Sequence, residues 1–222
     1  MKRVTLFAGH YGSGKTNLAV NYAIRLARSG IKTLIADLDI VNPYFRTRDS
    51  ETELDEAGVK IIVSPYANSN VDVPALPDEM YAVTDDRSYH CVIDVGGDDR
   101  GALALGRLAP KLNEENDYGM FLVVNFFRPL TQTADSVINV KNEIEFASGM
   151  RFGGIINNSN LGAQTRLKDV LSTVERAKEL SEKTDLPIVA TCVRQELAQE
   201  AAGSLNDITP IRLHFRGDWA IY

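Results

Sequence analysis

Residues 4–20 read VTLFAGHYGSGKTNLAV, and this stretch decides the fold class. Its apolar and β-branched beginning predicts a short buried strand over residues 3–8. The segment Gly9–Thr16 follows at once, with the spacing glycine, four residues, then Gly-Lys-Thr. From Lys15 to Ser29, apolar residues recur on one helical face. A strand, a glycine loop and a helix in this order predict a loop that holds phosphate groups.

Each residue type in this loop has a physical reason to be there. Gly12 and Gly14 allow the backbone to turn so that its amides point inward, and the following helix adds its positive end. Lys15 supplies a point charge for the outer phosphates, and the Thr16 hydroxyl is a ligand for Mg²⁺. The predicted nucleotide-binding residues of this segment are Gly9, Gly12, Ser13, Gly14, Lys15, Thr16 and Asn17.

Beyond the loop, short apolar strands alternate with helices along the chain. Strands are predicted at 33–38, 59–64, 90–95, 119–126, 153–158 and 187–193, and helices at 101–112, 131–147, 163–184 and 195–202. Because the strands are apolar throughout rather than two-sided, we expect a mostly parallel α/β sheet with helices on both faces, a Rossmann-like three-layer fold. No repeat or linker divides residues 1–222, so one domain is expected. A long functional loop and a short helix are predicted at 64–86, and an irregular or extended tail.

Composition narrows the functional classes. The chain has 222 residues, 44% of them hydrophobic, which is enough to form a core and excludes a wholly disordered chain. Its net charge of −6 offers no general attraction to nucleic acid or anionic lipid. The two cysteines cannot form a disulfide scaffold and are expected in the core. With apolar runs too short to span a bilayer and no signal-peptide core, we expect a cytoplasmic protein without a membrane anchor.

Four separated segments resemble the MinD/ParA and CobQ/CobB superfamily of P-loop proteins, the SIMIBI class. Besides the phosphate loop, they are IADLDIVNPYFR from Ile35, VIDVGGDDRG from Val92, GIINNSN from Gly154 and VRQELAQEA from Val193. The resemblance covers nearly the whole chain. It implies a parallel nucleotide-binding core that binds Mg-ATP.

The resemblance also implies individual roles. Asp39, the second acid of an Asp37/Asp39 pair, would position the attacking water and help to hold the metal ion; with Lys15 it is the catalytic candidate. Asp94, in the segment that resembles Walker B, would face Mg²⁺ together with Thr16. Gly97 would sense the γ-phosphate through its amide. Asn158 matches an adenine-binding asparagine, and Arg194 marks the second adenine-side loop.

The base is expected to be adenine, because the guanine-reading Asn-Lys-x-Asp pattern of many GTP sites is missing. One departure from the family concerns the dimer: His10 stands where MinD, ParA and nitrogenase iron proteins have a lysine that reaches across to a second subunit. Cys91 and Cys192 do not support a bridging iron-sulfur cluster, so an iron-sulfur reductase is rejected.

Three functions remain open from the sequence. The first is a slow ATPase switch that binds ATP and ADP and acts on an unidentified protein client, with a homodimer possible. The second is an ATP-dependent ligase or synthetase of the dethiobiotin-synthetase or CobB type, with its small-molecule acceptor in the loop from Asn68 to Pro77. The third is an ATP-binding scaffold that does not hydrolyse.

Overall fold

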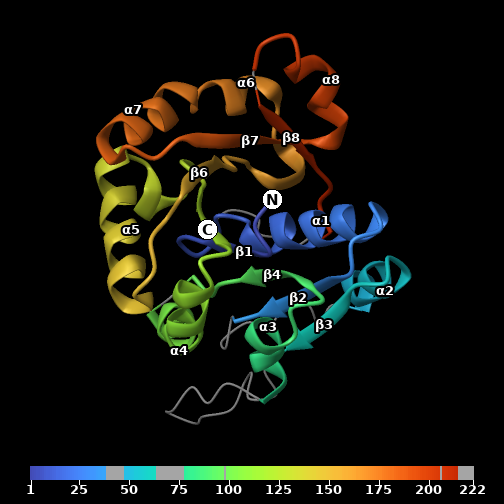
Figure 1. Ribbon diagram of the computed structural model, residues 1–222. Helices are drawn as coiled ribbons and strands as arrows, with labels where there is room; N and C mark the ends of the chain where they lie inside the picture. Colours follow the sequence, from blue (N-terminus) through green and yellow to red (C-terminus); the bar gives the residue numbers. More distant parts are fainter. Residues whose placement is uncertain (39–47, 64–77, 98, 206, 215–222) are drawn as a thin grey trace.

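The computed structural model describes residues 1–38, 48–63, 78–97, 99–205 and 207–214 (Figure 1). The strands are β1 (Val4–Ala8), β2 (Thr33–Asp37), β3 (Lys60–Val63), β4 (His90–Asp94), β5 (Tyr118–Val124), β6 (Gly154–Asn157), β7 (Ile188–Arg194) and β8 (Ile208–Ile211). The α-helices are α1 (Lys15–Arg28), α2 (Arg48–Glu56), α3 (Ala82–Asp85), α4 (Asp99–Glu115), α5 (Ala134–Ser148), α6 (Leu167–Leu171), α7 (Val174–Thr184) and α8 (Ala198–Ala201). Short 3-10 helices are η2 (Asp78–Tyr81), η3 (Pro129–Thr131), η4 (Gly162–Gln164) and η5 (Gln195–Leu197). Asp39 and the predicted acceptor loop from Asn68 to Pro77 lie outside the described residues.

The strands form one sheet in the order β3-β2-β4-β1-β5-β6-β7-β8, and every pair of neighbours is parallel. This confirms the expected parallel α/β fold. The strand that enters the phosphate loop, β1, lies between β4 and β5 in the middle of the sheet. The chain leaving β1 continues to β2 on one side, whereas the chain leaving β4 continues to β5 on the other side. Parallel sheets bind ligands at such a switch point.

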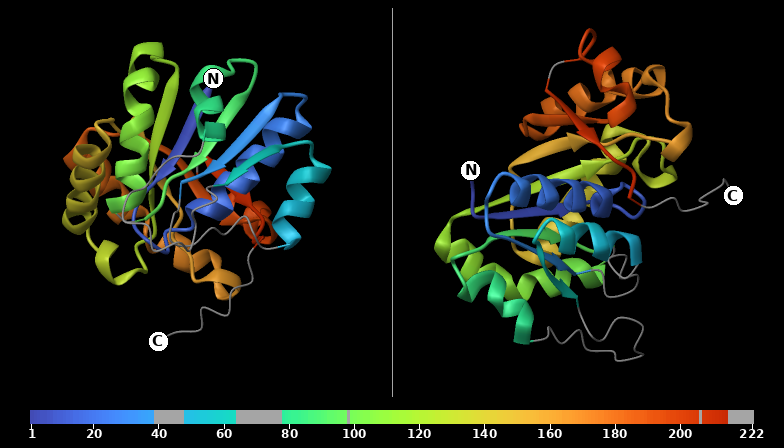
Figure 2. Two further views of the ribbon diagram at one scale, coloured as in Figure 1. Left: turned by 90° about the horizontal axis from the view of Figure 1, so that it is seen from below. Right: turned by 90° about the vertical axis from the view of Figure 1, so that its right-hand side faces the viewer.

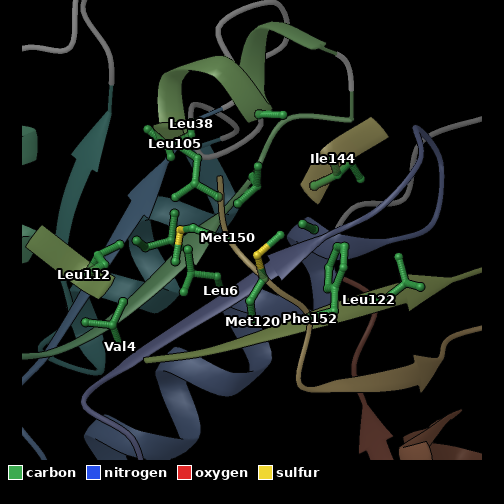
Figure 3. Close-up of a cluster of buried hydrophobic side chains, with 14 of the residues drawn as sticks. Val4, Leu6, Leu38, Leu105, Leu112, Met120, Leu122, Ile144, Met150 and Phe152 are labelled. Carbon is green, nitrogen blue, oxygen red and sulfur yellow. The ribbon is translucent and has the colours of Figure 1, made fainter. Parts of the chain in front are cut away.

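Helices cover both faces of the sheet, as Figure 2 shows. The sequence of β1 lacks an alternating polar face because both faces of this strand are buried. Val4, Leu6 and Ala8 pack into the core under α4 and α5, whereas Phe7 packs into the core under α1. Figure 3 shows Val4 and Leu6 within the first of these cores, among side chains from β5, α4 and α5. A strand buried on both faces leaves its carboxyl end as the place for polar groups.

The predicted single helix at 163–184 is wrong, because the chain forms α6 and α7 with a break at 172–173. Thr173 is fully buried, and its hydroxyl both donates to the Val170 carbonyl (2.7 Å) and accepts from Asn157 Nδ2 (3.0 Å). A buried asparagine at the end of β6 needs such a partner. Local hydrogen bonds of this kind compete with a continuous helix.

Two elements extend the predicted pattern. Helix α2 follows the segment after β2 and was not predicted, and the extended tail forms the edge strand β8. Cys91 and Cys192 are both buried, as expected for core residues. Among the described helices, none combines the length and the apolar character needed to cross a bilayer.

Candidate nucleotide-binding site

The candidate site lies where β1, β4 and β2 end. In the register of the sheet, Asp94 of β4 stands beside Phe7 of β1 on one side and beside Asp37 of β2 on the other. Asp37 and Asp94 are only 1% and 2% exposed. Because all the strands are parallel, their carboxyl ends bring these acids to the same edge as the phosphate loop.

Two glycines of the loop cannot be replaced without a clash. A Cβ on Gly9 would lie 2.3 Å from the carbonyl oxygen of Val123 on β5, so the loop leaves the sheet in close contact with the neighbouring strand. Gly14 precedes α1 with a φ of +83°, a left-handed conformation that favours glycine, and its Cβ would lie 2.4 Å from Asn158 Nδ2. The glycine spacing therefore reflects both backbone conformation and close packing.

Lys15 and Thr16 begin α1 and link the loop to the Walker B-like strand. Lys15 is 7% exposed, and its Nζ donates to the His10 carbonyl oxygen at 3.2 Å, which places the ammonium group back across the loop. Thr16 Oγ1 donates to Asp94 Oδ2 at 2.6 Å. Mg²⁺ is coordinated by oxygen atoms, and a hydroxyl and a carboxylate in contact can supply two of them. Water and phosphate would supply the rest of its coordination shell. The residues present fit this metal ion.

Gly97 packs directly on the phosphate loop. A Cβ at this position would lie 2.7 Å from the Tyr11 nitrogen and 3.1 Å from Lys15 Nζ. The residue thus stands beside the ammonium group that is predicted to hold the outer phosphates, two residues before α4 begins.

Asn158 supports the loop from the end of β6. It is 1% exposed, and its Nδ2 donates to the Ser13 carbonyl oxygen at 2.7 Å. Since a carbonyl only accepts, this contact fixes which side-chain atom is the amide nitrogen. Among the described residues, the buried Oδ1 of Asn158 has no hydrogen-bond partner. It is a buried acceptor next to the phosphate loop.

Sequence reasoning missed two residues that hold the loop. Asn125, fully buried after β5, donates from Nδ2 to the Gly12 carbonyl oxygen at 3.4 Å and to the Asn160 carbonyl oxygen at 3.1 Å. Arg128 donates from Nε to the same Gly12 oxygen at 3.0 Å. The hydroxyl of Thr131 donates to the Asn125 carbonyl oxygen at 2.6 Å and closes this turn. The signal was a polar residue directly after an apolar strand.

Three other predicted residues remain to be placed. Asn17 lies next to the loop, but its Oδ1 accepts from the backbone nitrogen of His214 at 2.9 Å. Arg194 donates from Nη1 to the Ala163 carbonyl oxygen and pairs with Glu196, so its contacts within the described part of the chain lie away from the loop. Ser13 lies in the loop, 1% exposed. The structure therefore brings together the phosphate-loop residues, Asp94, Gly97 and Asn158.

Solved structures with a similar fold include cell division protein FtsY from Thermotoga maritima, with a TM-score of 0.59, 16% identity, and coverage of 86% of this chain and 61% of that one. Chloroplast FtsY from Physcomitrella patens gives 0.55, 16%, 86% and 58%, and FtsY from Mycoplasma mycoides gives 0.50, 20%, 84% and 58%. At these identities the likeness shows the fold alone, and the chain spans about three fifths of the length of these proteins.

Curated protein sequences provide no match to the chain. The model of one protein family, described as the CobQ/CobB/MinD/ParA nucleotide binding domain, matches residues 4–200. That range includes the phosphate loop, both acids at the ends of β2 and β4, Gly97 and Asn158. The chain belongs to the CobQ/CobB/MinD/ParA family of nucleotide-binding domains.

Proposed function

We propose that this protein binds Mg-ATP, hydrolyses it slowly and acts as a nucleotide-dependent switch for a protein partner in the cytoplasm. The observation that carries the proposal is the contact between Thr16 Oγ1 and Asp94 Oδ2 at 2.6 Å, beside Lys15 and Gly97. It joins the phosphate loop to the Walker B-like strand. The same group of residues has the oxygen atoms for a metal ion and the positive charge for phosphates.

The chemistry follows from these groups. Lys15 would bind the outer phosphate oxygens as a point charge, while the loop amides and the N-terminal end of α1 would hold the rest of the chain of phosphates. Thr16 and Asp94 would hold Mg²⁺, which neutralises charge on the transferring phosphoryl group. Asp39 is proposed to orient the attacking water. Asp37, two residues before it at the end of β2, lies beside Asp94 in the register of the sheet.

Asn158 supports adenine as the base. Its amide nitrogen is already used by the Ser13 carbonyl, so the oxygen is the atom left for a ligand. Adenine carries an amino group that can donate to this oxygen, whereas guanine has a carbonyl at the equivalent position. Arg194, at the end of β7, is proposed as the marker of the second base-side segment.

The switch is proposed to run through Gly97. Gly97 touches Tyr11 and lies beside Lys15, so a γ-phosphate bound to Lys15 would contact the backbone at Gly97. Loss of the γ-phosphate would release this backbone. Helix α4 starts at Asp99 and would carry the difference to a protein client or to a second copy of the chain. ATP and water are the only substrates that this cycle needs.

The test is phosphate release from Mg-ATP, together with direct titration of ATP binding, at several protein concentrations. Lys15→Ala should lose at least tenfold in ATP affinity and lose turnover, whereas Lys168→Ala, an exposed lysine on α6, should behave as the parent. Turnover per chain that rises with protein concentration indicates a self-associating switch. Equal ATP affinity in Lys15→Ala and the parent would overturn the proposal. Binding without turnover would contradict unaided hydrolysis and favour either the scaffold function or a reaction that needs an acceptor or a partner.

A further inference from the structure

A pocket of about 310 Å³ lies between α1 and the segment 209–214, which includes the end of β8. Figures 1 and 2 show β8 running beside α1. None of the phosphate-loop residues lines this pocket. Its size is at the lower end of the range for small-molecule sites.

The charge of the pocket is opposite to that of the chain. Arg25 and Arg28 line it from the last turns of α1, Arg212 lines it from the other wall, and no lining residue is acidic. The whole chain, by contrast, has a net charge of −6. Among the described residues, Arg25 and Arg28 form no ion pair within 4.0 Å, whereas Arg212 Nη1 lies 3.2 Å from Glu53 Oε1. Positive charge on both walls is thus only partly balanced.

Contacts hold the two walls in place. The guanidinium carbon of Arg25 lies 5.1 Å from the ring centroid of Tyr22, a cation–π contact that limits the positions of this side chain. Asn21 of α1 pairs with the backbone of Arg212 in both directions, donating to its carbonyl oxygen at 2.9 Å and accepting from its nitrogen at 2.9 Å. The pocket is therefore built before a ligand arrives.

Its position along α1 connects it to the phosphate loop. His214, which lines the pocket, donates from its backbone nitrogen to Asn17, the residue after Thr16. Burial, with Arg212 and Arg28 adding to it, lowers the pKa of His214, while Glu53 opposes this effect. The carboxylate of Glu53 contacts Nδ1 of this imidazole, so the fixed cations of the pocket are the arginines.

We propose that this pocket binds a small organic anion with at least two negative charges, separately from the nucleotide. Guanidinium groups on facing walls match carboxylate and phosphate oxygens, which they bind through paired hydrogen bonds. Apolar side chains among the lining residues, Leu18 and Ile24, accommodate a short carbon skeleton. The pocket is a ligand site that the proposed ATP cycle does not use.

Two probes test the carboxylate and phosphate forms of this ligand: citrate and glycerol 3-phosphate, each titrated by calorimetry at constant ionic strength. The variants are Arg25→Gln and Arg212→Gln for the pocket, Lys15→Ala for the phosphate loop, and Arg107→Gln, an exposed arginine on α4, as the matched control. Circular dichroism of each variant checks that it is folded.

At least one probe should bind saturably, with one site per chain. Each pocket variant should weaken that binding about tenfold or more, since each removes charged hydrogen bonds, and Arg107→Gln and Lys15→Ala should leave it unchanged. Two results overturn the inference. One is no saturable binding of either probe; the other is binding that survives Arg25→Gln and Arg212→Gln but is lost in Lys15→Ala, which would place the anion in the phosphate loop. Neither result alters the ATP titration, so the proposed function is judged separately.

Discussion

Replacement of Asn158 by alanine tests two roles of one side chain. The amide nitrogen donates to the Ser13 carbonyl oxygen at 2.7 Å, inside a part of the protein where Asn158 is 1% exposed. The amide oxygen is the acceptor proposed for adenine. Alanine removes both groups and leaves the main chain of β6 in place.

The magnitude follows from the burial. A buried carbonyl that loses its donor is destabilised by about 1–3 kcal/mol. If this free energy is lost from the phosphate-bound form of the loop, every nucleotide should bind more weakly by about 5-fold to about 150-fold. Loss of the acceptor should in addition lower the preference for ATP over GTP toward equal affinity, because adenine presents an amino group where guanine has a carbonyl.

The assay is calorimetric titration of the parent and Asn158→Ala with ATP, GTP and ADP. Asn113→Ala is the matched control, since Asn113 is an exposed asparagine on α4 whose Nδ2 donates to the Gly149 carbonyl at 3.4 Å. Equal losses for ATP and GTP would keep the loop-supporting role and remove the base-reading role. Unchanged affinity for all three nucleotides in Asn158→Ala would refute both.

Three further predictions rest on the described contacts. Arg128→Ala should weaken ATP binding about tenfold or more, since it removes a charged donor from a loop carbonyl; Arg128→Lys keeps the charge but not Nε, and recovery in titrations of that variant would contradict the role of the hydrogen bond. The unfolding free energy should fall as the pH drops below about 6.5, because the pKa of His214 is lowered in the folded state and the unfolded chain takes up the proton first. Urea unfolding at pH 5.5 and 7.5 should show a smaller pH effect in His214→Gln, and an identical effect in both proteins would disprove it. Burial raises the pKa of Cys91 to about 11 and of Cys192 to about 12, so a thiol reagent at pH 8 should label neither in the native protein and both in urea. Labelling of the native protein at the unfolded rate would contradict their place in the core.

The parts that could be predicted from the sequence are those set by local patterns. The spacing Gly9–Thr16 and the apolar runs before and after it predicted β1, the loop and α1, and the structure confirms these elements. The contact of Thr16 with Asp94 could also be anticipated, because two buried parallel strands bring their carboxyl ends together. The assignment of catalysis to Asp39 stays a prediction.

The parts that could not be predicted depend on contacts between distant segments. Thr173 lies in a stretch with good helical composition, yet it divides two helices because it is the buried partner of Asn157. Arg128 carries no motif, and its contact with the Gly12 carbonyl exists only because β5 lies beside β1. Arg25 and Arg212 are far apart in the chain, so nothing in either segment indicates that they line one pocket.

The position of β1 within the sheet accounts for how the site is divided. The strands on one side, β4 and β2, end in the acids Asp94 and Asp37. The strands on the other side, β5 and β6, lead to Asn125, Arg128 and Asn158, which donate to carbonyls of the loop and bring no negative charge. Carboxylates attract a metal ion, whereas they repel the negatively charged phosphates. The phosphate loop lies between the acidic strand ends and the uncharged or basic ones. A chain of net negative charge can therefore hold the phosphates, because its acids lie only on the side where a metal ion would separate them from the phosphates.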